Sequence, residues 1–253
     1  MDSCSPASRS SAGGYASISV PTQRRNQTHW LRVVSEEPQW LPGDFWTGNS
    51  DANVFVGLAK PRVLDTTEWD EQGWRRVRAE VMTRMPGHPC SPTDVLRAPL
   101  DLPVTWWAQL RRTIGAIGST PTTRFNVDQD KITRRVRAAF GDRVELRIDR
   151  WETVHGDLHW SNLLAPEFGL VDWEMWGRGP AGTDAATLYC YSLLVPAMAH
   201  RVREVFADVL DMPAGRLAQV CVAARLLTRA AQDYPDLADP LYQHTQSLLD
   251  QRC

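Results

Sequence analysis

Three polar residues in one short stretch have the types and the spacing that phosphoryl transfer requires. Asp157 is followed five positions later by Asn162, and ten positions further on by Asp172, which comes directly after a short apolar run. A carboxylate can orient an attacking hydroxyl and accept its proton, while an amide oxygen and a second carboxylate can hold magnesium against nucleotide phosphates. The spacing therefore predicts one base and two metal ligands.

The elements around these residues explain how they would meet. Gly156 beside Asp157 lets backbone and substrate approach closely. The segment from Asn162 to Ala165 reads as a strand, Pro166 and Glu167 as a turn, and Gly169 to Asp172 as a returning strand. Such a hairpin would bring Asn162 and Asp172 together. Two hard oxygen ligands with a carboxylate nearby favour magnesium over zinc.

The run from His155 to Asn162, together with Val171 to Glu174, resembles the active-site signature of the aminoglycoside phosphotransferase and choline kinase-like family. That family shares the protein-kinase fold, with His-Gly-Asp where protein kinases have His-Arg-Asp. The resemblance covers the chain from about Lys60 onward and is weak before it. It implies that Asp157 is the catalytic base and that Asn162 and Asp172 bind the metal. It also implies ATP, or alternatively GTP, with magnesium, and a small-molecule substrate carrying a hydroxyl, such as an amino alcohol or an aminoglycoside.

Neighbouring residues could support the loop, contact the substrate or fill the wall of the site. His155 is expected to position the loop through hydrogen bonds, whereas His159 either contacts substrate or metal-bound water or simply packs. Glu174 either accepts a hydrogen bond from the loop or substrate or has no direct role. Three tryptophans either stack on a flat or cationic substrate or fill the wall of the site: Trp160, Trp173 and Trp176.

The N-terminal third has the pattern of a small β-sheet. His29 to Ser35 is apolar and β-branched, as a strand should be, and Arg32 stands where the resemblance places a nucleotide-binding lysine. Arg32 either contacts phosphates in a modified way or is an ordinary strand residue. In the irregular segment from residue 40 to 57, Asp44 and Asp51 are the acidic candidates to pair with it, and the favoured alternative for both is a solvated loop carboxylate.

Two further strands and a hinge complete this part. Pro61 to Trp69 and Arg75 to Met82 are expected to pair across a turn at Asp70 to Gly73, with Val77, Ala79 and Val81 facing inward. The segment that follows resembles a hinge at which an adenine ring is bound. Met82 and Met85 either pack on that ring or belong to the core.

The fold expected from these patterns is α+β and bilobal, protein-kinase-like, with a small antiparallel β lobe and a larger, mainly helical lobe. Residues 1–19 read as a flexible N-terminus, 20–86 as the small lobe with its hinge, and 87–253 as the helical lobe that carries the catalytic loop and hairpin. Ala12 to Ser17, with its Gly-Gly pair, is an alternative candidate for a degenerate phosphate-covering loop.

Helices are expected from Pro103 onward. Trp106, Leu110 and Ile117 recur at helical spacing, and Asp128 to Phe140 forms an amphipathic segment with a basic outer face. Four more helices are expected at 185–195, 197–210, 215–231 and 239–251, separated by prolines. Thr183 or Asp184 is expected to cap the first of them.

The bulk composition limits the classes of partner that are expected for this protein. The chain has 253 residues and a net charge of −2, which gives no reason to expect nucleic acid or an acidic membrane as partner. It has no apolar run long enough for a membrane span, and no secretory signal. Its five cysteines include no Cys-x-x-Cys pair, which argues for the cytoplasm and against a disulfide framework. A monomer or a homodimer is expected.

A second class of function stays open. Lysine occurs only at positions 60 and 131, the glycine loop is weak and the small lobe is short. These features fit a kinase-fold protein that binds nucleotide or a partner without catalysis. A serine hydrolase is excluded by the lack of a Gly-x-Ser-x-Gly elbow, and a glycosidase would leave Asn162 without a role.

Overall fold

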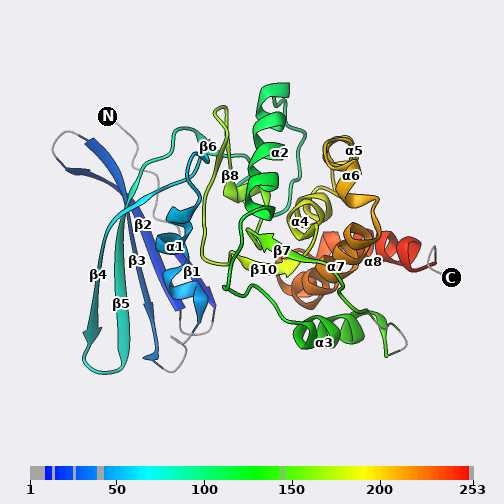
Figure 1. The fold of residues 1–253 in the computed structure, drawn as a ribbon, viewed down its shortest axis with the longest axis horizontal. Helices are drawn as coiled ribbons and strands as arrows, with labels where there is room; N and C mark the ends of the chain where they lie inside the picture. Colours follow the sequence, from blue (N-terminus) through cyan, green and yellow to red (C-terminus); the bar gives the residue numbers. More distant parts are fainter. Residues whose placement is uncertain are drawn as a thin grey trace. The chain divides into compact units, whose positions relative to one another are not determined.

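The chain forms two compact units, which are Met1–Pro86 and Gly87–Cys253. They are seen in a computed structural model that describes residues 9–12, 15–24, 27–38, 43–142, 144 and 146–250. In Figure 1 the first unit runs from blue to cyan and is mostly strands, and the second runs from green to red and is mostly helices.

The N-terminal unit is built on one antiparallel sheet of five strands in the order β1-β2-β3-β5-β4. Its strands are β1 Arg9–Ala12, β2 Tyr15–Arg24, β3 Gln27–Glu36, β4 Val63–Glu71 and β5 Arg75–Thr83. The expected strand around Arg32 and the expected pairing of β4 with β5 are both confirmed.

The structure describes strands within the segment that was expected to be a flexible N-terminus, residues 1–19. Arg9–Ala12 and the first half of Tyr15–Arg24 are paired strands, with Ala12 opposite Tyr15. Serine and alanine have little strand preference of their own, and the pairing of β1 with β2 and of β2 with β3 accounts for these strands instead. Gly13 and Gly14, the core of the alternative phosphate loop, lie outside the described residues, as do residues 1–8.

The expected inward face of β5 is also wrong. Val77 and Met82 are buried, but so are Arg78 and Glu80, which alternation assigned to solvent. Burying these charges is tolerable because they are paired: the Arg78 guanidinium donates to Glu80 at 3.0 Å and also to Glu68.

The partner of Arg32 belongs to the same group of charges. Arg32 lies 3.6 Å from Glu80, on the neighbouring strand. Asp51, one of the two acidic candidates of the irregular segment, accepts a hydrogen bond from Thr47 at 2.6 Å. The segment expected to replace the small-lobe helix, of which Trp40 lies outside the described residues, consists of short turns: η2 Asp44–Thr47, α1 Gly48–Asp51 and η3 Ala52–Val54.

The C-terminal unit combines short strands with seven helices in its described part. The strands are β6 His88–Pro89, β7 Trp151–Val154, β8 Leu163–Ala165, β9 Gly169–Leu170 and β10 Gly177–Pro180. The helices are α2 Val104–Gly118, α3 Gln129–Phe140, α4 Thr183–Tyr191, α5 Pro196–Val205, α6 Ala207–Leu210, α7 Pro213–Asp233 and α8 Pro235–Asp250. The expected helices are present with shifted ends, except that the one expected at 197–210 is divided into α5 and α6. The helix α7 packs against α3, α4 and α8 (Figure 1).

An aromatic cluster supports the segment that carries Asn162. Trp160 is fully buried and stacks on Trp106 of α2, with ring centroids 6.4 Å apart. The Trp106 indole N–H donates to the Leu164 carbonyl at 2.8 Å, and the Trp160 indole N–H donates to Ser192 at 3.0 Å. Because each buried indole has a hydrogen-bond partner, the cluster fixes β8 and the residues before it.

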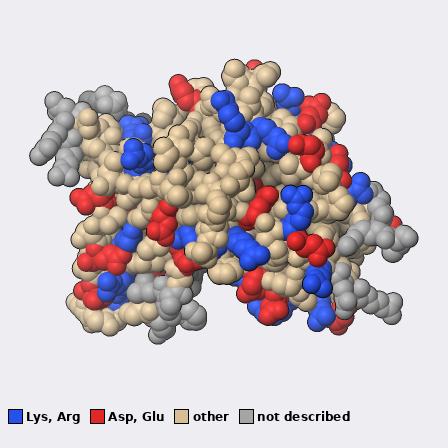
Figure 2. Space-filling view, in the orientation of Figure 1, with Lys and Arg blue, Asp and Glu red and all other residues tan. Residues whose placement is uncertain are grey.

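No helix in the described part of the chain combines the length and the apolar character needed to cross a membrane. Acidic and basic side chains are interspersed on the face shown in Figure 2.

Packing between α6 and α7 gives a test of the fold. A Cβ on Gly215 would lie 1.9 Å from the Val209 carbonyl oxygen, whereas a Cβ on Gly115, in α2, would meet nothing within 4 Å. Gly215→Ala is therefore expected to lower the free energy of unfolding by about 2 kcal/mol, because backbone must move. Gly115→Ala, the matched control, should raise it by about 0.5–1 kcal/mol through lost unfolded-state entropy. Chemical denaturation measures both, and equal effects would contradict the packing.

Candidate active site

The loop that carries Asp157 connects β7 to the short helical turn Trp160–Asn162. Gly156 has a φ of +82°, which disfavours other residues. A Cβ there would also lie 2.2 Å from the Asn126 side-chain nitrogen and 2.7 Å from the Met175 carbonyl. Glycine is therefore required by both conformation and space, as the sequence indicated.

Asp184 holds this loop from the first turn of α4. Its carboxylate accepts the backbone N–H of His155 at 2.7 Å and that of Gly156 at 2.9 Å. Burial raises the pKa of Asp184 to about 6, against the opposing effect of these two hydrogen bonds. The expected capping role of Thr183 or Asp184 is wrong, because Gly182 is the N-cap residue and no side chain caps the helix.

Arg225 holds the same loop from α7. Its guanidinium donates from Nη1 to the Gly156 carbonyl at 2.7 Å and from Nη2 to the Thr187 hydroxyl at 3.3 Å. The peptide unit before Asp157 is therefore bonded at its carbonyl to one helix, while the preceding N–H groups are bonded to another.

The Asp157 carboxylate is ionised and accessible. Burial acts to raise its pKa, but the hydrogen bond from His159 and the charges of His159 and Arg225 hold the pKa well below its usual range. His159 Nε2 lies 3.2 Å from one carboxylate oxygen, and Arg225 lies 4.0 Å from the other. With a third of the side chain exposed, Asp157 can meet a substrate group.

His159 is held by a chain of polar contacts on both sides of its ring. Nδ1 lies 2.9 Å from the Ser161 hydroxyl, which donates to Asp94 at 3.3 Å, and Nε2 lies 3.6 Å from Asp94. Burial acts to lower the pKa of His159, but the hydrogen bond and charge of Asp157 and the charges of Asp94 and Asp172 raise it overall. His159 therefore orients the Asp157 carboxylate, a role that neither sequence reading included.

The expected hairpin is present. β8 pairs with β9, and the Val171 N–H donates to the Asn162 carbonyl at 2.9 Å, so Asp172 follows directly after the last pairing. The Asn162 amide nitrogen donates to the Asp157 carbonyl at 3.0 Å, which leaves the amide oxygen as a candidate ligand. Asp172 is exposed, with a left-handed φ of +64°.

These two donors suit a magnesium ion, which takes one or two protein oxygens and completes its shell with phosphate and water. The described residues include no group of three His, Cys, Asp or Glu side chains arranged to hold a metal by themselves. The donor set is thus of the kind that binds a metal together with a nucleotide.

The other predicted site residues have structural positions. His155 is completely buried, its ring packs edge-on to Trp173 at 4.9 Å, and burial lowers its pKa to about 4, so it is neutral. The three tryptophans of this region are all buried, which favours the wall-filling reading: Trp160, Trp173 and Trp176. The Glu174 carbonyl accepts a hydrogen bond from Arg124 at 3.3 Å.

Arg32, Met82 and Met85 all belong to the N-terminal unit. Contacts join the loop, the hairpin and the two helices that hold them, α4 and α7, into one site. Sequence reasoning missed Arg225, Asp94 and Ser161 as members of this group. Of the residues that hold the loop, only Asp184 was singled out in the sequence, after the Gly-rich turn before α4, and it was interpreted as a helix cap.

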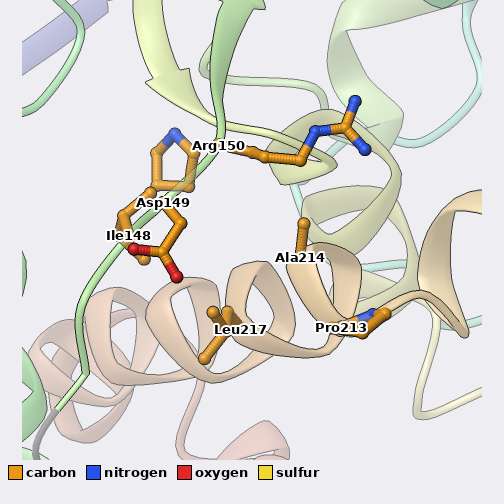
Figure 3. A pocket seen from close by; sticks show the side chains of 7 residues that line it. Ile148, Asp149, Arg150, Pro213, Ala214 and Leu217 are labelled. Atoms are coloured by element: carbon orange, nitrogen blue, oxygen red, sulfur yellow. The ribbon is translucent and has the colours of Figure 1, made fainter.

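A separate pocket of about 230 Å³ lies between the segment 148–150 and the first turns of α7 (Figure 3). Its lining is largely apolar, and no residue of the catalytic loop or hairpin contributes to it. It is therefore distinct from the site built around Asp157.

The raised pKa of Asp184 predicts a pH-dependent contribution to stability. Because its folded pKa of about 6 lies above the unfolded value of 3.8, the folded state binds the proton more tightly, and this group's contribution increases as pH falls from 7 to 4. In Asp184→Asn that contribution is absent. The difference in unfolding free energy, wild type minus variant, should grow by about 2 kcal/mol over this range. A difference that is constant with pH would contradict a buried, ionised Asp184.

No protein-family model and no curated protein matches the sequence. Solved structures are similar in fold. Amicoumacin kinase in complex with AMP-PNP, Ca²⁺ and Ami has a TM-score of 0.59 at 13% identity, covering 97% of this chain and 88% of that one. Spectinomycin phosphotransferase in complex with ADP and spectinomycin has a TM-score of 0.48 at 9% identity, covering 94% and 88%. Choline kinase from Streptococcus pneumoniae has a TM-score of 0.39 at 13% identity, covering 91% and 92%.

The similarity to amicoumacin kinase extends over nearly the whole chain and includes both units. At this level of identity the similarity concerns the fold. The chain therefore has an α+β fold similar to that of amicoumacin kinase.

Proposed function

We propose that this protein is a small-molecule kinase that transfers the γ-phosphate of ATP to a substrate hydroxyl with the help of magnesium. The observation that carries the proposal is a pair of hydrogen bonds: the Asn162 side chain donates to the Asp157 carbonyl, and Val171, the residue before Asp172, donates to the Asn162 carbonyl. The fold similarity to a small-molecule kinase supports it. Fold alone does not determine chemistry, so the argument depends on these side chains.

Asp157 is proposed as the group that receives the substrate hydroxyl. Its low pKa makes it a weak proton acceptor, so its main effect is to orient the hydroxyl and to accept the proton late in the transfer. This agrees with a loose transition state, in which positioning and charge stabilisation dominate. The hydrogen bond from His159 fixes the carboxylate in one direction while the exposed part of the side chain meets the substrate.

Asn162 and Asp172 are proposed to hold the magnesium, which when bound would bridge phosphate oxygens and neutralise their charge. The Asn162 side chain is preorganised for this, because its nitrogen is engaged with the Asp157 carbonyl and its position follows from the buried Trp160 beside it. ATP is the proposed donor, with GTP as the alternative. Arg32, Met82 and Met85 are proposed as its contacts in the N-terminal unit.

The acceptor class follows from the resemblance in the loop: a small hydroxyl-bearing amine, amino alcohol or sugar. One observation favours a second candidate function, a kinase-fold protein that binds without catalysis. Arg32, at the expected lysine position, is paired with Glu80 within the sheet. A thermal-shift titration with ATP and magnesium, followed by ATP-consumption assays on aminoglycosides and amino alcohols, separates the two. Binding without turnover on a broad panel would favour the second.

Asp157→Asn tests the proposed base. The variant keeps the size of the side chain but loses the charge, and phosphate transfer is expected to fall by at least about 100-fold, the range of general-base effects. Nucleotide binding, measured by thermal shift, should persist. Asp239→Asn, an exposed aspartate on α8, serves as the matched control. Turnover at the wild-type rate in Asp157→Asn would remove Asp157 from the mechanism.

Asp172→Asn tests the proposed metal ligand. Asp172 supplies the negative charge of the proposed ligand pair Asn162 and Asp172. Without it, the magnesium concentration that gives half-maximal turnover should rise by about 10-fold or more. A magnesium titration at saturating ATP measures it. An unchanged magnesium requirement would show that the metal is held elsewhere.

A further inference from the structure

We propose that Arg225 is a positioning residue of the catalytic loop: it binds the Gly156 carbonyl and thereby sets the direction of the Asp157 carboxylate. The role of Asp157 as the group that meets the substrate rests on the proposed function, whereas the loop contact itself does not. Arg225 lies on α7, 69 residues along the chain from Gly156.

The peptide units of the loop are held from two helices. Asp184 of α4 accepts the N–H groups of His155 and Gly156, and Arg225 of α7 donates to the carbonyl of Gly156 at 2.7 Å. A glycine has the widest range of backbone conformations, so this is the position where the loop needs external restraint. With both sides of Gly156 bonded, the φ of +82° is fixed, and so is the course of the chain into Asp157.

Arg225 holds the loop through its backbone and does not form a close ion pair with Asp157. Its short contacts go to a carbonyl and to the Thr187 hydroxyl, whereas its distance to Asp157 is 4.0 Å. A close bidentate pair would occupy the carboxylate oxygens, which the planar guanidinium readily does elsewhere. Here the charge attracts Asp157 while the carboxylate keeps its exposed side for a substrate.

The surroundings of Arg225 favour a functional reason for the charge. The helix α3 packs on α7 and brings Arg135 towards Arg225. Burial, followed by the charges of Arg225 and Arg134, lowers the pKa of Arg135. Like charges brought together are unfavourable unless anionic groups compensate, and the Asp157 carboxylate is one such group within reach of Arg225.

The chain offers a matched control one turn further along the same helix. Arg229 forms an exposed ion pair with Asp233 at 2.7 Å, on the same helix. Arg225→Met and Arg229→Met therefore remove the same guanidinium from the same helix, and only the first removes the bond to Gly156. Arg225→Lys keeps the charge but not the fork.

Two readouts test the proposal. In turnover assays, Arg225→Met is expected to lower kcat by about 100-fold, the effect of small misplacement of a reacting group, with little change in the KM for ATP. Arg225→Lys should recover part of kcat, and Arg229→Met should match the wild type. In hydrogen exchange, amides of residues 152–164 should exchange faster in Arg225→Met, while those of α8 should not change.

The outcomes distinguish this inference from the proposed function. If the wild type shows no phosphate transfer on any acceptor but the loop exchanges faster in Arg225→Met, the holding role stands and the proposed function fails. Unchanged loop exchange would overturn the inference whatever the turnover. Faster exchange throughout the C-terminal unit, in Arg225→Met and Arg225→Lys alike, would also overturn it, because Arg225 would then be a general stability residue.

Discussion

The site depends on one constraint, the fixation of the Gly156 peptide between α4 and α7. Asp184 accepts its N–H and Arg225 donates to its carbonyl, and both partners are reached over long separations in the chain. A loop glycine in a left-handed conformation would otherwise sample many directions. Because the next residue is Asp157, holding Gly156 at both its N–H and its carbonyl converts the packing of two helices into the direction of one carboxylate.

The remaining parts of the site follow from local packing around that point. Trp160 is buried against α2, and its placement fixes Asn162 two residues later. His159, bridged to Ser161 and Asp94, sets the orientation of the Asp157 side chain. In this motif, residues that are packed in the core alternate with residues that face the proposed site. This alternation explains why the spacing of the motif is recognisable in the sequence.

Local pattern predicted the hairpin, most of the helices and the grouping of Asp157 with Asn162, because these depend on residues close in sequence. It could not predict Arg225, one arginine among many, since a contact across 69 residues leaves no periodic trace. It also misassigned Arg78 and Glu80 to solvent: alternation distinguishes two faces of a strand but not whether a charged face is buried by paired charges.

The most direct test of the central claim is to locate a bound metal. Crystals grown with Mn²⁺ and a non-hydrolysable ATP analogue would show the metal by its anomalous scattering. The account predicts one manganese bonded to the Asn162 side-chain oxygen and the Asp172 carboxylate at about 2.1 Å, with nucleotide phosphates completing its shell and the Asp157 carboxylate directed towards the terminal phosphate. A metal-nucleotide complex bound away from Asn162 and Asp172 would contradict it.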